Sequence, residues 1–320
     1  MLGAMTVTTD WVKDHRSRAV ALRRVVAAIN EKGGVGKTSI TANLAGQVAA
    51  TGRRTLAIDL NRQGNLSRDF GIRRTPQDDQ GAALRSAIVE GTALQVAPDV
   101  RPNLDVAVGG SKLEDLTLTI TMLLTRGDFH EAYLKLAAAI APIAHEYQLI
   151  VIDCPPESPV LDNLALAAAR WVMIPTKSDD GSLDGMELVA QRFQQMRQIN
   201  PTMQLLGAVL FATGTNAKAI HGKVRKSVAD LFGGEDKSPL FQQHIRHAER
   251  VAVDCREMGM LVHELKEYAE QQPNYWTAKR SGLNPRPMSA ALDGLATDYL
   301  NLAKELLMVI AQSEQRGAQA

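Results

Sequence analysis

The feature that most constrains how this chain folds is a glycine-rich segment between an apolar run and a helix-forming one. It consists of Lys32, Gly33, Gly34, Val35, Gly36, Lys37, Thr38 and Ser39. A phosphate loop of the pattern G-x-x-x-x-G-K-[ST] would place its first glycine where Glu31 stands. The chain instead has the variant K-G-G-x-G-K-T, in which a second lysine opens the segment.

This variant predicts a nucleotide-phosphate site. Its glycines carry no Cβ, so the backbone N–H groups can approach a phosphate closely. We expect Lys37 to reach the β- and γ-phosphates and the Thr38 hydroxyl to bind Mg²⁺.

Lys32 has no role within its own loop, so we expect it to supply charge to the phosphates of a neighbouring subunit. The alternative, a plain glycine-rich turn with two solvated lysines, leaves the flanking strand and helix pattern unexplained.

The composition excludes several classes of protein. Lys and Arg number 36 and Asp and Glu 35, so no overall charge draws the chain to nucleic acid or membrane, and such binding needs a local patch. Cys154 and Cys255 supply neither a disulfide framework nor a cysteine metal cluster. No apolar run approaches the ~18–20 residues that span a bilayer, and the first residues lack a signal-peptide pattern. We therefore expect a soluble cytoplasmic protein.

Short apolar runs alternate with helical patterns along most of the chain. The predicted strands are Val25–Ile29, Leu56–Leu60, Leu104–Val108, Leu149–Ile152, Trp171–Ile174 and Leu205–Phe211. The predicted helices between them are Thr38–Ala50, Gly81–Glu90, Phe129–Ala144 and Ser182–Gln198. Continuous apolar runs are typical of strands buried on both faces of a parallel sheet. The pattern predicts an α/β fold with a doubly wound, mostly parallel sheet flanked by helices.

Three parts of the chain are expected. Residues 1–24 form a mostly polar N-terminal extension, with a short helix predicted from Asp10 to Arg24. Residues 25–265 form the P-loop domain, and residues 266–320 a loop and a helix that pack on the same domain. The last helix is predicted from about Ser289 to Ile310, because apolar residues recur there at helical spacing.

Two aspartates lie at the ends of predicted strands. Asp59 ends the second apolar run and Asp153 follows the fourth. Ligands of doubly wound sheets bind beyond the carboxyl ends of the strands, so both fall at the edge where the phosphate loop lies. Asp153 has the position from which a carboxylate holds Mg²⁺, directly or through water. A lone aspartate there would more often be a helix cap or turn residue, but the phosphate loop favours a metal site.

Taken together, these motifs resemble the ParA family of the ParA/MinD superfamily, P-loop ATPases with a deviant Walker A motif. The resemblance rests on residues 30–38, 43–45, 58–65, 152–156, 163–167, 174–175 and 183–186. It covers roughly residues 25–265, and its most specific motifs lie in the first two-thirds of that range.

The resemblance implies an ATPase that uses ATP and Mg²⁺ and forms a homodimer with the nucleotides sandwiched between its subunits. Lys32 would be the in-trans lysine, Lys37 the phosphate-loop lysine, Thr38 and Asp59 residues of the metal site, and Asp153 the acidic residue of the second nucleotide motif. ATP-bound dimers of the family bind DNA nonspecifically. A ParB-like centromere-binding protein stimulates the hydrolysis that releases them. The implied function is partition of a plasmid or chromosome by a nucleoid-associated protein.

One departure from the family pattern bears on catalysis. The family usually has D-x-D-x-Q where this chain has Asp59-Leu60-Asn61-Arg62-Gln63. The second aspartate of the pattern helps to position or polarise the attacking water, and Asn61 cannot supply its negative charge. We therefore expect hydrolysis to be slow or more dependent on the partner, while ATP binding and dimerisation survive.

Two further sites are predicted less directly. The adenine base is expected at the loop of residues 211–216 after a late strand, with Asn216 as a contact.

Nonspecific, salt-sensitive DNA contact is assigned to basic residues of the C-terminal half. They are Lys218, Lys223, Arg225, Lys226, Arg246, Arg250, Lys279 and Arg280. For each of these residues alone, a solvated surface position is the simpler interpretation.

Other functions on the same framework remain open. A MinD-like membrane regulator needs a basic amphipathic C-terminal helix, and residues 306–320 contain Arg316 as their one arginine and no lysine. An ATPase that positions a protein cargo would have the same motifs as one that partitions DNA. A metabolic enzyme of the iron-protein branch would need cysteines between its subunits, and the two cysteines of this chain are poorly placed for that.

Overall fold

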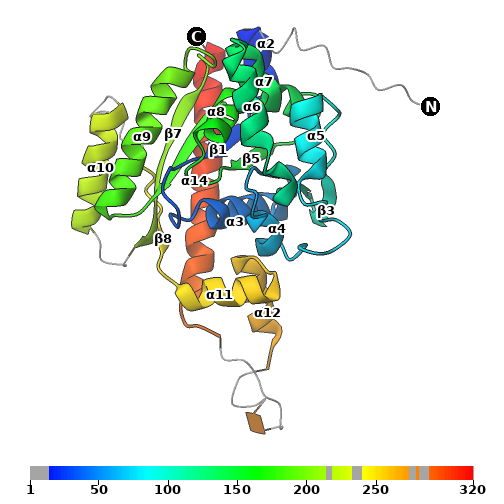
Figure 1. Cartoon of the computed structure of the whole chain (residues 1–320). Coiled ribbons are helices and arrows are strands. Elements are labelled where there is room, and N and C mark those ends of the chain that lie inside the picture. The colour runs from blue at the N-terminus through cyan, green and yellow to red at the C-terminus, as the bar shows by residue number, and fades with distance from the viewer. Residues whose placement is uncertain (1–13, 214–217, 233–239, 274–278, 281–287, 320) are drawn as a thin grey trace.

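A sheet of eight strands forms the centre of the part of the chain that the structure describes (Figure 1). The computed structural model describes residues 14–213, 218–232, 240–273, 279–280 and 288–319. The strands are β1 (Val25–Ala28), β2 (Thr55–Asp59), β3 (Ala97–Arg101), β4 (Leu104–Ala107), β5 (Leu149–Asp153), β6 (Trp171–Thr176), β7 (Gln204–Thr213) and β8 (Ile245–Arg246).

The strand order explains why ligands are expected near β1. The order is β3-β4-β2-β5-β1-β6-β7-β8, and every neighbouring pair is parallel except β3 with β4. The segment after β1 therefore emerges between β5 and β6, the kind of crevice in which open α/β sheets bind ligands. The predicted doubly wound, mostly parallel sheet is confirmed.

Strand β3 was not predicted from the sequence. It lies at the edge of the sheet and contains Pro98 and exposed Asp99, so it lacks the continuous apolar run of the inner strands. Its antiparallel pairing with β4 is irregular between Ala97 and Arg101. Proline and an irregular register are both tolerated at an edge.

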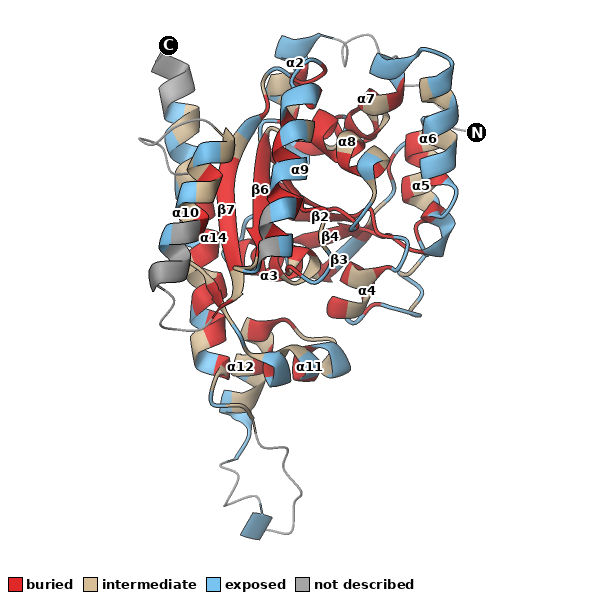
Figure 2. Cartoon of the chain, turned by 60° about the vertical axis from the view of Figure 1, so that its left-hand side comes forward, coloured by how far each residue is buried: buried red, intermediate tan, exposed pale blue. Residues whose placement is uncertain are grey.

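Helices cover both faces of the sheet, and the strands are buried between them (Figure 2). Alternate residues of β1 pack into opposite cores, with Val25 and Ala27 on one face and Val26 and Ala28 on the other. The first core is covered by α2 (His15–Ala21), α5 (Ala82–Glu90), α6 (Leu116–Thr125), α7 (Phe129–Ile140), α8 (Pro159–Ala168), α9 (Asp180–Met196) and α10 (Lys218–Phe232), with 3-10 turns at η1 (Ser111–Leu113) and η2 (Ala144–Glu146). On the other side lie α3 (Lys37–Ala50), α4 (Asn65–Asp69), α11 (Glu249–Met258), α12 (Val262–Gln271) and α14 (Leu292–Gln319).

The terminal segments are part of these cores. Helix α14 contacts α3 and β8, and its apolar stripe from Leu292 to Ile310 is buried, as its spacing predicts. It continues to Gln319, beyond the predicted end. Helix α2 spans His15–Ala21 rather than the whole predicted range, since Asp14 caps its first turn. Residues 10–13 of that prediction lie outside the described residues.

Helix α12 runs across position 265, so the predicted boundary there coincides with no end of an element. None of the helices in the described ranges is both long enough and apolar enough to cross a membrane.

Candidate nucleotide site

The glycine-rich segment forms the turn between β1 and α3 at the carboxyl edge of the sheet. Gly36 has a φ of 89° and directly precedes the first residue of α3, and Gly34 has a φ of 74°. Both values lie in the left-handed region that favours glycine. A Cβ at Gly36 would also lie only 2.4 Å from the ring of Phe211 in β7. Gly36 stands at the N-cap of α3 and has no side chain to cap the helix, which leaves the first N–H groups of α3 available to an anion.

Lys37 lies buried at the base of this loop. Its Nζ donates to the carbonyl oxygens of Asn30 at 2.6 Å and Lys32 at 2.8 Å, and the residue is 6% exposed. Burial lowers the pKa of Lys37, while the carboxylates of Asp153 and Asp162 act in the opposite direction. The ammonium group is therefore held under the loop by two carbonyls, with acidic groups nearby that offset its charge.

Thr38 and Asp153 form the polar end of the site. Strands β2 and β5 place Asp59 and Asp153 at paired positions, and the Thr38 hydroxyl donates to Asp153 Oδ2 at 2.6 Å. Asp153 is completely buried, and its Oδ1 accepts no hydrogen bond from the described residues. Burial and then the nearby Asp59 raise the pKa of Asp153. A buried carboxylate oxygen without a donor, next to a hydroxyl, fits a hard divalent cation such as Mg²⁺.

Asp59 anchors the loop that follows β2. Its Oδ1 accepts the N–H of Asn61 at 2.8 Å and its Oδ2 accepts the N–H of Leu66 at 3.0 Å. Burial raises the pKa of Asp59 to about 7, although these two backbone bonds favour the charged form. Each oxygen thus already has a backbone partner, in contrast to Asp153 Oδ1.

Asn61 is buried within the same loop. Its Oδ1 accepts the N–H of Gln63 at 2.9 Å, and the residue is 5% exposed. This bond shapes the turn and an aspartate would make it equally well, so the local backbone does not require the amide.

A cavity of about 720 Å³ lies over the loop and is lined by most of the predicted phosphate-loop residues, though not by Lys32 or Val35. Among its lining residues are Gly33, Gly34, Gly36, Lys37, Thr38, Ser39, Asn61, Pro155 and Pro156. A second cavity of about 350 Å³ shares Ser39 and Arg256 with the first and is lined by Phe211, Ala212 and Tyr299 among others. It adjoins the segment predicted to hold the adenine base. Asn216, the predicted base contact, lies outside the described residues.

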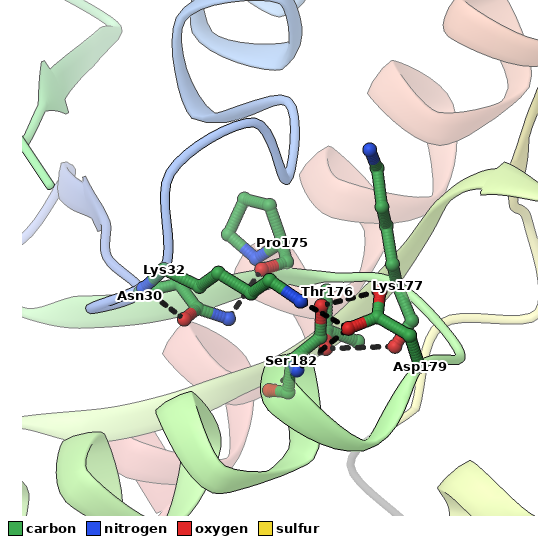
Figure 3. A network of polar contacts seen from close by, with 7 residues as sticks. All are labelled: Asn30, Lys32, Pro175, Thr176, Lys177, Asp179 and Ser182. Carbon is green, nitrogen blue, oxygen red and sulfur yellow. Dashed lines mark hydrogen bonds and ion pairs between the residues drawn. The ribbon is translucent and has the colours of Figure 1, made fainter.

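Lys32 occupies the outer rim of the loop rather than its base. Its side chain is 37% exposed and forms an ion pair with Asp179 at the start of α9 (Figure 3). Asp179 lies far from the loop in sequence and was not predicted as a site residue. The one available signal was its position, an aspartate shortly after a buried strand and just before a helical pattern.

Asp162 is a second residue near the loop that the sequence analysis missed. It lies on α8, is completely buried, and neither of its carboxylate oxygens has a hydrogen-bond donor among the described residues. Burial and then the neighbouring Glu31 raise its pKa, while Arg192, which pairs with Glu31, lowers it. A single acid within the apolar helix sequence Leu161–Ala168 was the signal that could have identified it.

Replacing Asp162 by asparagine should stabilise the protein at neutral and higher pH. Because the folded-state pKa of Asp162 is raised, the folded chain binds its proton more tightly than the unfolded chain. The wild type should therefore lose stability relative to the variant as pH rises from about 4 through that folded-state pKa. The amide can also donate to Glu31, and we expect a gain of about 1–3 kcal/mol at pH 8.

Urea unfolding at a series of pH values measures this difference. Asp230→Asn, which removes an exposed carboxylate on α10, is the matched control and should leave the pH profile unchanged. If the free energy of unfolding of Asp162→Asn and of the wild type changed with pH in parallel, the prediction would be contradicted.

The predicted DNA-contacting residues lie in several places. Arg225 and Lys226 are on α10 and Arg250 is on α11, and Figure 1 shows these two helices well apart. Lys279 and Arg280 are exposed. Lys218 and Lys223 belong to α10, but their side chains lie outside the described set.

The charge of Arg246 is engaged by an acidic residue of another element. Arg246 donates to both carboxylate oxygens of Asp298 on α14, at 2.7 and 2.8 Å, and it lines the second cavity. This ion pair fastens β8 to α14, and DNA contact by Arg246 stays a prediction.

Sequence comparisons relate the chain to known proteins. The family model described as "AAA domain" matches residues 23–205. The chain is 30% identical over 248 residues to "Chromosome partitioning protein ParA" of Myxococcus xanthus, an alignment that covers 76% of this chain and 82% of that protein.

Solved structures support the fold at lower sequence identity. Apo McdA of Cyanothece superposes with a TM-score of 0.67 at 18% identity, covering 89% of this chain and 99% of that chain. The septum site-determining protein MinD of Pyrococcus horikoshii, complexed with Mg-ADP, gives 0.60 at 20% identity, covering 88% and 95%.

Proposed function

The chain belongs to the ParA family of P-loop ATPases, and we propose that it is a DNA-partition ATPase of plasmid or chromosome segregation. ATP closes two copies of the chain around two nucleotides, the dimer binds DNA without sequence preference, and hydrolysis stimulated by a ParB-like partner releases it. The observation that carries the proposal is the contrast between the loop's two lysines. Lys37 is buried under its own loop, whereas Lys32 lies at the exposed rim.

The chemistry we propose begins with phosphate binding. The N–H groups at the start of α3 and the Lys37 ammonium bind the β- and γ-phosphates, since both are fixed before a ligand arrives. Lys32 of one copy contacts the phosphates bound by the other copy and adds positive charge where negative charge develops. These residues act by position and charge, and none of them forms a covalent bond to the nucleotide.

We propose that Thr38 and Asp153 hold Mg²⁺ with the nucleotide. The orphaned Asp153 Oδ1 and its hydroxyl neighbour support this assignment. The ion supplies charge neutralisation for the phosphate oxygens. Asp59 contributes to the metal site chiefly by holding the loop of Asn61, because both of its oxygens already accept backbone N–H groups.

We propose DNA contact through exposed basic residues outside the nucleotide site. Lys226 on α10, Arg250 on α11, Lys279 and Arg280 are exposed candidates, and Arg225 on α10 is half-buried. The net charge of +1 gives no global attraction, so these local charges must supply it. Cytoplasmic and nucleoid localisation follows from such binding.

Sedimentation velocity with ATP, with ADP and without nucleotide tests the proposed switch. The expected result is a monomer without nucleotide or with ADP and a dimer with ATP and Mg²⁺. Chelation of Mg²⁺ should weaken the dimer. A chain that hydrolyses ATP while remaining monomeric at all concentrations would contradict the proposal.

A further inference from the structure

The partner of Lys32 within its own chain is Asp179. The Lys32 Nζ donates to Asp179 Oδ1, and Figure 3 shows the lysine extended from the loop toward the start of α9. The side chains are 37% and 48% exposed, so the pair lies at the surface. The nearby lysine hydrogen bond is the first cause of the lowered pKa of Asp179. The ion pair thus holds Lys32, the lysine at the rim of the loop, to Asp179.

The position of the Asp179 carboxylate is fixed by the helix that it caps. Its Oδ1 accepts the N–H of Ser182 at 3.1 Å, and its Oδ2 accepts the Ser182 hydroxyl at 3.0 Å. This is the usual arrangement of an N-cap aspartate. The carboxylate is therefore oriented before Lys32 engages it.

Two glycines allow α9 to lie against the start of the loop. A Cβ at Gly181 would lie 2.9 Å from Lys32 Nζ, and one at Gly185 would lie 2.5 Å from Asn30 Oδ1. Asn30 itself accepts the backbone N–H of Lys32 and donates to the carbonyl of Pro175 at the end of β6. The backbone of Lys32 is thus fixed to the sheet, while its side chain depends on Asp179.

We propose that Asp179 is a positioning residue that holds Lys32 on its own chain and so restrains the ATP-dependent dimer. This inference rests on the proposed function, in which Lys32 acts on nucleotide in a second copy. To reach that nucleotide, Lys32 must leave Asp179, so the ion pair competes with dimerisation. An exposed ion pair favours its bound state by up to about fivefold. Two protomers together therefore oppose the dimer by up to about 25-fold.

The variant Asp179→Asn tests the restraint without removing the cap. Asparagine caps helices about as well as aspartate, so α9 should remain: its Oδ1 can accept the Ser182 N–H, and its NH₂ group can donate to the Ser182 hydroxyl oxygen. The dimer dissociation constant with ATP, measured by sedimentation velocity, should fall severalfold relative to the wild type. The difference should shrink in high salt, which screens exposed pairs. Asp230→Asn controls for the loss of one exposed acidic charge on α10.

A double-mutant cycle with Lys32→Ala separates this restraint from a general effect on α9. Asp179→Asn should leave dimerisation unchanged when Lys32 is absent. An equal effect in both backgrounds, no effect, or a weaker dimer in the Asp179→Asn single variant would overturn the inference. If the wild type forms a dimer with ATP and the Asp179→Asn variant has the same dimer dissociation constant, only this inference is refuted. If neither forms a dimer with ATP, the proposed function fails as well.

Discussion

Replacing Lys37 by alanine should reduce ATP affinity by at least about 100-fold. The ammonium is buried at the base of the loop and within hydrogen-bonding distance of two loop carbonyls, so the substitution removes a positive charge that is fixed at the phosphate site. A hydrogen bond to a charged group contributes about 1.5–3 kcal/mol, and two such bonds to phosphate account for the expected loss. Titration of the protein with ATP by calorimetry measures it.

Two controls make the result of Lys37→Ala specific. Lys304→Ala removes an exposed lysine of α14 and should leave ATP affinity unchanged. Thermal unfolding checks that the variant is folded, because the substitution leaves the carbonyls of Asn30 and Lys32 without this donor. A folded Lys37→Ala variant that binds ATP as tightly as the wild type would refute the assignment of the phosphate site.

Replacing Asn61 by aspartate should raise the rate of ATP hydrolysis about tenfold or more. The side chain lies in the cavity over the loop, and its Oδ1 already makes the turn-shaping bond to Gln63 that a carboxylate would keep. The variant adds the negative charge that can polarise an attacking water, an effect usually larger than tenfold. The substitution also places a third carboxylate near Asp59 and Asp153, and repulsion among the three reduces the expected rise in the hydrolysis rate.

Steady-state turnover with saturating ATP, with and without DNA, measures this change. Asn61→Ala removes the amide without adding charge and should not raise turnover. An unchanged rate in Asn61→Asp, with ATP affinity intact, would show that the missing carboxylate does not limit hydrolysis in this chain.

The inner part of the fold could be predicted from sequence because its signals are local. Runs such as Leu149–Ile152 are continuous and apolar, and the glycine loop stands directly between a strand and a helix. Edge strand β3 and helix α6 lacked such signals. Proline interrupts the first, and Leu alternates with Thr in the second, which matches the period of a strand rather than a helix. Tertiary packing on the first core decides that α6 is helical.

Six of the predicted residues of the phosphate loop, Gly33, Gly34, Gly36, Lys37, Thr38 and Ser39, line one cavity, because the motif is nearly contiguous. The pairs that link distant segments were not predictable in the same way. Lys32 with Asp179, Glu31 with Arg192, and Arg246 with Asp298 each join charges from different elements. One sequence gives no signal of such pairing, since it depends on which helix packs beside which strand end.

The most direct test of the proposed partition function is DNA binding as a function of the bound nucleotide. The protein is titrated onto a fluorescent duplex of arbitrary sequence with ATP and Mg²⁺, with ADP and Mg²⁺, or without nucleotide, in a series of salt concentrations. We expect DNA binding that requires ATP and weakens steeply with salt, as is typical of Lys and Arg contacts to phosphates. Absence of DNA binding in every nucleotide state, from a protein that still binds ATP, would contradict it, and lipid vesicles would then be the next surface to test.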